Sequence, residues 1–126
     1  GATMMLKRDV LQQTGLFDED FFIYCEEVDW EWRIHKAGWK ILCVPQAHVT
    51  HLGGQSTSQV SAWSTVNLWK SRLQLYDKHY PHWKRWLARR LVVLGMQYKI
   101  ARLNPEVSNY DDVLSAYQTV IEMAKA

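Results

Sequence analysis

Residues 16–33 read LFDEDFFIYCEEVDWEWR, a stretch in which acidic and aromatic residues alternate closely. It holds seven carboxylates among six large aromatic side chains, and its first basic residue is Arg33. Carboxylates packed against aromatic rings can have raised pKa values, and they can bind metal ions or sugar hydroxyl groups. The stretch is therefore predicted to form one side of an active site. Composition alone favours a simpler interpretation, an acidic loop followed by an amphipathic helix.

The bulk composition is that of an ordinary globular domain: 126 residues, 48% hydrophobic and 22% charged, with a net charge of +2. The charges are unevenly placed, because residues 79–105 contain six Lys or Arg and no Asp or Glu. Such a block can bind a membrane surface or a polyanion. No apolar run approaches the ~20 residues that cross a bilayer. Cys25 and Cys43 lack metal or redox spacing, so free thiols in a reducing compartment are expected.

Periodicity and breaker residues predict a mixed first part followed by a helical part. Helices are predicted at residues 9–14, 24–36, 61–80 and 82–103, with a last helix starting near residues 108–111. Short strands are predicted at residues 2–6, 39–45 and 47–51. Three short strands bury little apolar surface without further partners. The chain is therefore expected to be a piece of a longer protein, as its Gly-Ala-Thr start also indicates.

Short motifs follow one another in a fixed order over the first fifty-odd residues. They are Gly1-Ala2-Thr3-Met4, Lys7-Arg8, Gly15-Leu16-Phe17-Asp18-Glu19, Phe21-Phe22, Tyr24-Cys25-Glu26-Glu27-Val28-Asp29, Arg33, Gly38, Pro45, His51 and Gly53 to Ser56. In this order and spacing they resemble the second half of the catalytic domain of family 2 glycosyltransferases. These are inverting enzymes with the GT-A fold, and the resemblance is strongest to their bacterial rhamnosyltransferase-like members. It covers a little under half of the chain.

The resemblance implies an α/β fold, a partial GT-A (Rossmann-like) nucleotide-diphospho-sugar transferase fold with a mostly α-helical C-terminal tail. Residues 1–57 would be the C-terminal part of the catalytic domain, with the acceptor side and the base, and residues 58–126 a helical extension. The full-length enzyme would transfer a sugar from a nucleotide-diphosphate donor to a saccharide or lipid-linked glycan, with inversion, in cell-surface polysaccharide synthesis. The chain alone is expected to be inactive, because it shows no Gly-rich phosphate cradle and no donor-binding half.

The resemblance places the catalytic base at Glu27, where the family usually has Asp. A base must reach the acceptor hydroxyl, and the extra methylene of Glu moves its oxygen by about one bond length. Either the backbone compensates or Glu26 shares the role. Asp29 lies four residues before Arg33, so the two are predicted to pair on one helical face, with Asp29 as an orienting residue. The alternative is that Glu26 and Glu27 are first-turn acids that stabilise the helix dipole.

The substrate side is also assigned by the resemblance. Phe21, Phe22 and Trp30 would supply apolar or stacking surface for sugar, with Arg33 and Asp18 beside them. Residues 18–20 read Asp-Glu-Asp and so have the form of an Asp-x-Asp metal motif. The family's own metal motif lies upstream of everything present here, so this triplet is predicted to be loop.

A divalent cation, Mn²⁺ or Mg²⁺, is implied for the full-length enzyme. His51 corresponds to a position that in some members helps hold it, and imidazole suits Mn²⁺ better than Mg²⁺. The alternative is a hydrogen-bonded surface histidine. His48 would lie on the opposite face of a strand, which argues against a metal-binding pair.

The helical part carries four tryptophans and the basic block, a combination typical of an amphipathic helix that lies on a membrane. Residues 82–103 are the candidate for such a peripheral contact, with core packing or a homo-oligomer contact as the alternatives. A cytoplasmic protein, peripheral at the inner face of the cytoplasmic membrane, is expected. Nucleic-acid binding is not expected, because the chain is near neutral and holds no recognition motif. The rival function is a non-catalytic helical interaction or membrane-docking module.

Overall fold

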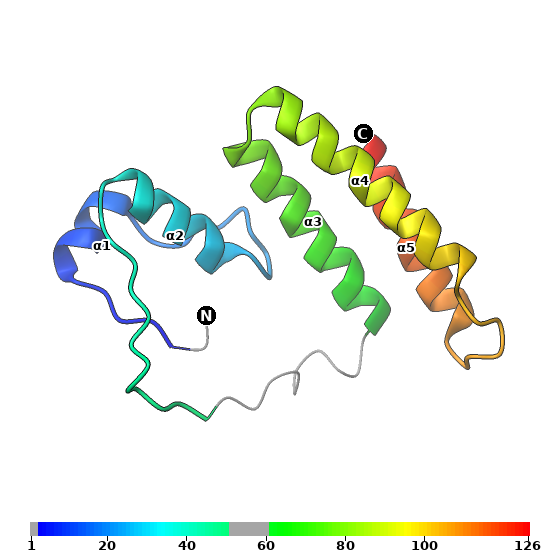
Figure 1. The fold of residues 1–126 in the computed structure, drawn as a ribbon, viewed down its shortest axis with the longest axis horizontal. Helices are drawn as coiled ribbons and strands as arrows, with labels where there is room; N and C mark the ends of the chain where they lie inside the picture. The colour runs from blue at the N-terminus through cyan, green and yellow to red at the C-terminus, as the bar shows by residue number, and fades with distance from the viewer. Residues whose placement is uncertain (1–2, 51–60) are drawn as a thin grey trace. The chain divides into compact units, whose positions relative to one another are not determined.

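The computed structural model describes residues 3–50 and 61–126. The chain divides into two compact units, Gly1–Gln55 (the N-terminal unit) and Ser56–Ala126 (the helical unit). The N-terminal unit contains helices α1 (Arg8–Thr14) and α2 (Glu26–Lys36), and the helical unit contains α3 (Ser61–His79), α4 (His82–Ala101) and α5 (Tyr110–Lys125) (Figure 1).

The predicted α/β fold is wrong, because the described residues are 64% helical and contain no strand. Residues 3–6 and 39–44, which carry most of two predicted strands, have no regular secondary structure. A strand exists only as part of a hydrogen-bonded ladder, and apolar alternation alone supplies no partner. Within residues 3–6, Met5 is 97% exposed, whereas Met4 packs against the core of the N-terminal unit. The last predicted strand ends at His51, outside the described residues.

The two helices of the N-terminal unit stop where glycines allow the chain to turn. Gly15 follows α1 with φ +73°, and its N–H donates to the carbonyl of Leu11 at 2.9 Å. Gly38 follows α2 with φ +87°, a left-handed conformation that glycine adopts at little cost. Val10 on α1 packs against Trp30 and Ile34 on α2, and this small cluster is the core of the unit.

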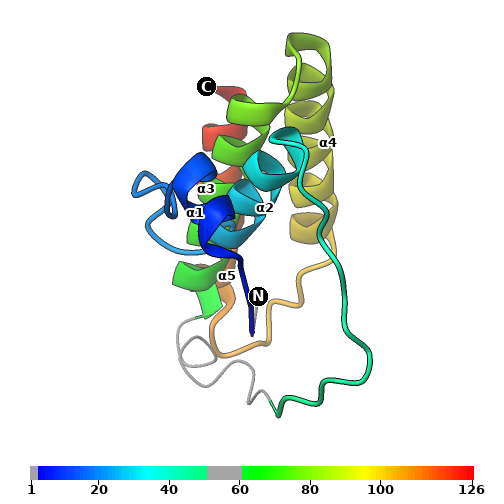
Figure 2. The same cartoon turned by 90° about the vertical axis from the view of Figure 1, so that its left-hand side faces the viewer.

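The helical unit is a three-helix bundle in which α5 packs against both α3 and α4 (Figures 1 and 2). Pro81, which has no N–H to donate, separates α3 from α4 as predicted. The three predicted helices of this part are confirmed, with ends within two residues of those expected. The buried core is made by one set of apolar side chains: Leu73, Val92, Met96, Val120, Ile121 and Ala124.

One arginine ties the three helices together. Arg89 of α4 donates from Nη2 to Asp77 Oδ2 on α3 at 2.6 Å and from Nη1 to the carbonyl of Met123 on α5 at 2.9 Å. The second contact places a cation at the C-terminal end of α5, where the helix dipole favours positive charge. In the part of the chain that the structure describes, no helix has the length and apolar character needed to cross a membrane.

Candidate functional site

Arg33 anchors the loop that joins α1 to α2. Its Nε donates to Asp29 Oδ2 at 2.9 Å, which confirms the predicted pair. Its Nη2 donates to the carbonyl of Leu16 at 2.7 Å, and its Nη1 donates to the carbonyl of Thr14. The Asp29 side chain is fully buried. Because the guanidinium joins a buried carboxylate to the last carbonyl of α1 and to a loop carbonyl, Arg33 and Asp29 fix how the loop leaves α1.

Trp30 reinforces the same anchor from inside the core. The residue is 6% exposed, its Nε1 donates to Thr14 Oγ1 at 3.1 Å, and the Phe17 ring meets it edge-on at 4.9 Å. The Trp30 side chain is therefore part of the core of the N-terminal unit. Its contact with sugar stays a prediction. Thr14 was not singled out from the sequence. The only feature in the sequence that could have identified Thr14 is its hydroxyl group at the predicted end of a helix.

Two residues immediately before α2 have left-handed backbone conformations. Tyr24 and Cys25 have φ values of 67° and 66°, and neither is a glycine. Such a residue costs on the order of 1 kcal/mol or more, and these conformations cluster at functional sites. The carbonyl of Cys25 accepts the N–H of Asp29 at 2.8 Å and so begins the helix. The strained turn therefore sets Glu26 and Glu27 in the first turn of α2.

The acid pair Glu26–Glu27 lies at the helix end that favours negative charge. Burial acts to raise the pKa of the Glu27 carboxyl, but hydrogen bonds from the backbone N–H groups of Glu27 and Val28 are among the contacts that hold that pKa below its ordinary value. Glu27 is therefore ionised at neutral pH, the form that a general base requires. Glu26 Oε2 is buried and accepts no hydrogen bond from the described residues. A buried carboxylate oxygen without a donor is suited to a ligand hydroxyl or a cation.

The loop before α2 exposes the ring of Phe22 more than that of Phe17, at 76% against 47%. Asp18 Oδ1 accepts the N–H of Asp20 at 3.0 Å, and the carbonyl of Asp18 accepts the N–H of Phe21 at 3.1 Å. These bonds close a turn, so the prediction that residues 18–20 are loop is confirmed. Phe21 is 6% exposed, whereas Phe22 is 76% exposed. Phe22 is thus the predicted stacking residue that presents its ring to solvent.

The described residues do not complete a metal site. Within residues 3–50 and 61–126, no three His, Cys, Asp or Glu side chains are grouped so that they could hold a metal ion. His51, the predicted ligand, lies outside the described residues. Glu26 Oε2 alone is too small a donor set for a divalent cation. The cation therefore stays a prediction, and no step of the chemistry is assigned to it.

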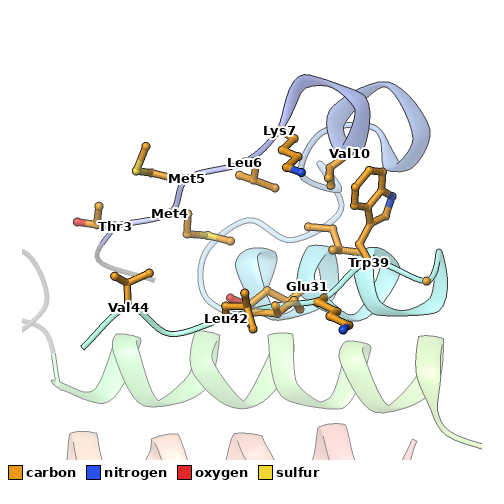
Figure 3. Close-up of a pocket in the computed structure, with 14 residues that line it drawn as sticks. Thr3, Met4, Met5, Leu6, Lys7, Val10, Glu31, Trp39, Leu42 and Val44 are labelled. Carbon is orange, nitrogen blue, oxygen red and sulfur yellow. The ribbon is translucent and has the colours of Figure 1, made fainter. Parts of the chain in front are cut away.

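A groove in the N-terminal unit is a different surface from the acid pair. It has a volume of about 610 Å³ and is lined mainly by residues 3–7 and 38–44. Figure 3 shows these two segments on either side of the groove, with Val10 and Trp39 at one end. Among the described residues that line it, Glu31 is the only acidic one, and none of them is a predicted catalytic residue. The groove is therefore apolar surface of the unit, and the predicted chemistry lies elsewhere on α2.

Comparison with known proteins gives one clear similarity. The chain is 37% identical over 93 residues to an N-acetylglucosaminyl-diphospho-decaprenol L-rhamnosyltransferase of Mycobacterium tuberculosis strain CDC 1551, and equally to the protein of the same name in strain H37Rv. The match spans 71% of this chain and 30% of each relative. The chain is similar to a part of these rhamnosyltransferases. No family model matches it, and no solved structure matches it significantly.

The predicted rhamnosyltransferase-like character is thus confirmed. The rhamnosyltransferase-like chain spans a little under one third of the length of the curated relatives that it matches. Membership of family 2, inversion at the sugar carbon and the division at residues 57 and 58 into catalytic part and extension stay predictions. The same holds for the roles of the individual site residues.

Proposed function

We propose that the full-length protein transfers rhamnose from a nucleotide-diphosphate donor to a lipid-linked N-acetylglucosamine acceptor. The observation that carries this proposal is the 37% identity over 93 residues to proteins named for that transfer. Residues 14–33 build an anchored turn that ends in two carboxylates, a suitable arrangement for removing a proton from an acceptor hydroxyl. The product would be a glycan intermediate of cell-surface polysaccharide synthesis.

In the proposed reaction Glu27 is the general base. The acceptor hydroxyl oxygen attacks the anomeric carbon of the donor, its proton passes to the Glu27 carboxylate, and the bond from that carbon to the diphosphate oxygen breaks. Attack from the face opposite the leaving group inverts the configuration. Glu26 supports the base, with its buried Oε2 as an acceptor for a second hydroxyl. Asp29 acts indirectly, because it holds Arg33 and thereby the loop.

The remaining parts of the proposal concern the substrates and the place of action. Phe22 would stack on a sugar face, with Phe21, Trp30, Arg33 and Asp18 shaping the surface behind it. A divalent cation, with His51 as one ligand, is proposed for the full-length enzyme. The enzyme would work at the inner face of the cytoplasmic membrane, where a lipid-linked acceptor is held, with residues 82–103 as its peripheral contact.

Rhamnose transfer by the full-length protein with Glu27→Gln tests the base. The amide cannot accept the proton, so turnover should fall by about 10²–10⁴-fold, the usual contribution of a general base. Glu31→Gln, on the same helix, is the matched control and should stay within a few-fold of wild type. The anomeric configuration of the product, read by NMR, tests inversion. A Glu27→Gln enzyme as active as the Glu31→Gln enzyme would remove Glu27 from the mechanism.

A further inference from the structure

An apolar stripe runs along the outer face of α4. It consists of Trp83, Leu87, Leu91, Leu94 and Tyr98, which we call the α4 stripe. Between 44% and 64% of each residue is exposed. At 3.6 residues per turn the five positions fall within roughly 80° of the helix circumference. Val92 and Met96, the buried residues of α4, lie on the opposite side. The bundle therefore packs one face of α4 and leaves a second apolar face open.

Positive charge borders the α4 stripe on both sides. Lys84 and Arg90 lie over the rings of Trp83 and Trp86 at 5.4 and 5.5 Å. Arg102, just beyond the helix, lies over Tyr98 at 4.7 Å. These cation–π contacts hold the charged groups beside the apolar residues rather than away from them.

The other basic residues of the block have structural roles. Arg89 and Arg85 both pair with Asp77 of α3, at 2.6 and 3.7 Å. Lys99 lies over the ring of Tyr117 on α5 at 5.4 Å. Residues 79–105 contain no Asp or Glu to neutralise the three cations that border the α4 stripe. The face is thus apolar at its centre and cationic at its margins.

We infer that the α4 stripe docks on an anionic lipid bilayer, with the helix axis parallel to the membrane surface. Large apolar side chains flanked by Lys and Arg are the features with which a helix lies at the boundary between headgroups and acyl chains. A second copy of the chain fits less well, because pairing two such faces would bring their cationic margins together. This inference rests on the proposed function for its purpose, since it would hold the enzyme beside a lipid-linked acceptor.

Flotation of the chain with vesicles tests the docking. Vesicles of equal parts phosphatidylglycerol and phosphatidylcholine should carry the protein upward at low salt, and high salt or phosphatidylcholine alone should reduce its binding. Leu87→Ser with Leu94→Ser should weaken binding at least tenfold, because each serine would bury much less apolar area in the bilayer than the leucine it replaces. Val107→Ser, which changes a 45% exposed apolar residue outside α4, is the control and should bind as wild type.

The cationic margins are tested by a separate set of variants. Each Lys or Arg near an anionic surface strengthens binding by about fivefold, so Lys84→Gln, Arg90→Gln and Arg102→Gln together should weaken it by roughly 100-fold. The matched control removes three exposed cations elsewhere: Lys7→Gln, Lys40→Gln and Lys70→Gln. It should stay within about threefold of wild type, because these residues lie outside α4.

Four results would overturn the inference. They are no flotation of the wild-type chain, equal loss in the matched control, a change of oligomeric state in the leucine variants by light scattering, and a large fall in their melting temperature. The third would show a second copy on the α4 stripe, and the fourth would show that protein already covers it. None of these measurements requires sugar transfer. Failure of docking therefore leaves the proposed reaction standing, and failure of the Glu27 test leaves docking standing.

Discussion

Replacing Arg33 with leucine should open the N-terminal unit while leaving the helical unit intact. The guanidinium contacts three acceptors, the carboxylate of Asp29 and the carbonyls of Thr14 and Leu16. Removing one partner of a buried ion pair costs about 3–5 kcal/mol. Asp29 is 0% exposed, but the Arg33 side chain is 24% exposed, so water reaches part of the pair and the lower end applies. We expect the free energy of local unfolding of α2 to fall by about 3 kcal/mol.

Amide hydrogen exchange followed by mass spectrometry suits this measurement, because it reports each unit separately and does not require the chain to unfold in one step. Peptides covering residues 16–36 should lose protection by on the order of 100-fold in Arg33→Leu, while peptides from α3 to α5 stay unchanged. Arg8→Leu, at the exposed start of α1, is the matched control.

The double variant Asp29→Asn with Arg33→Leu separates the charge from the loop contacts. Because no charge is left buried, it should recover at least about 1 kcal/mol of the loss. Protection in Arg33→Leu equal to that in Arg8→Leu would refute the role of Arg33 as an anchor. A double variant no more stable than Arg33→Leu alone would refute the buried charge as the cause.

Two further changes test other parts of the structure. Arg89→Met should lower the thermal stability of the helical unit by about 2 kcal/mol, because a charged donor to α5 and to Asp77 is lost. Thermal unfolding followed by circular dichroism measures this loss, with Arg90→Met as the control. A loss no larger in Arg89→Met than in Arg90→Met would contradict the prediction. Trp30→Phe and Thr14→Val should each cost about 1 kcal/mol through their shared hydrogen bond. The double variant should lose less stability than the two single variants lose in sum, as measured by hydrogen exchange of residues 16–36. Fully additive losses would show that the hydrogen bond contributes nothing to stability.

Local chemistry made most of the helices predictable. Pro81 cannot donate to the preceding turn, Gly15 and Gly38 accept positive φ, and the spacing of Asp29 and Arg33 identifies one helical face. These signals act within four or five residues, so a single sequence contains them in full.

The absence of strands from the described residues was not predictable in the same way. Apolar runs such as residues 39–44 indicate a strand only if another segment pairs with them, and pairing depends on residues far away in the chain. The same limit affected the candidate site. The resemblance groups Trp30 and Phe22 as stacking residues, whereas packing buries Trp30 and exposes Phe22. The left-handed pair Tyr24–Cys25 had no signal at all, because neither residue favours positive φ.

The anchor formed by Arg33 also bears on how the protein can vary between species. Two of its three contacts are made to main-chain carbonyls, those of Thr14 and Leu16, which any amino acid would provide. Substitutions at position 16 should therefore accumulate freely, since its side chain is 70% exposed and unused by the anchor. An inserted or deleted residue between positions 14 and 16 would move a carbonyl out of reach. Among natural relatives, the length of this connection should be far more constant than its composition.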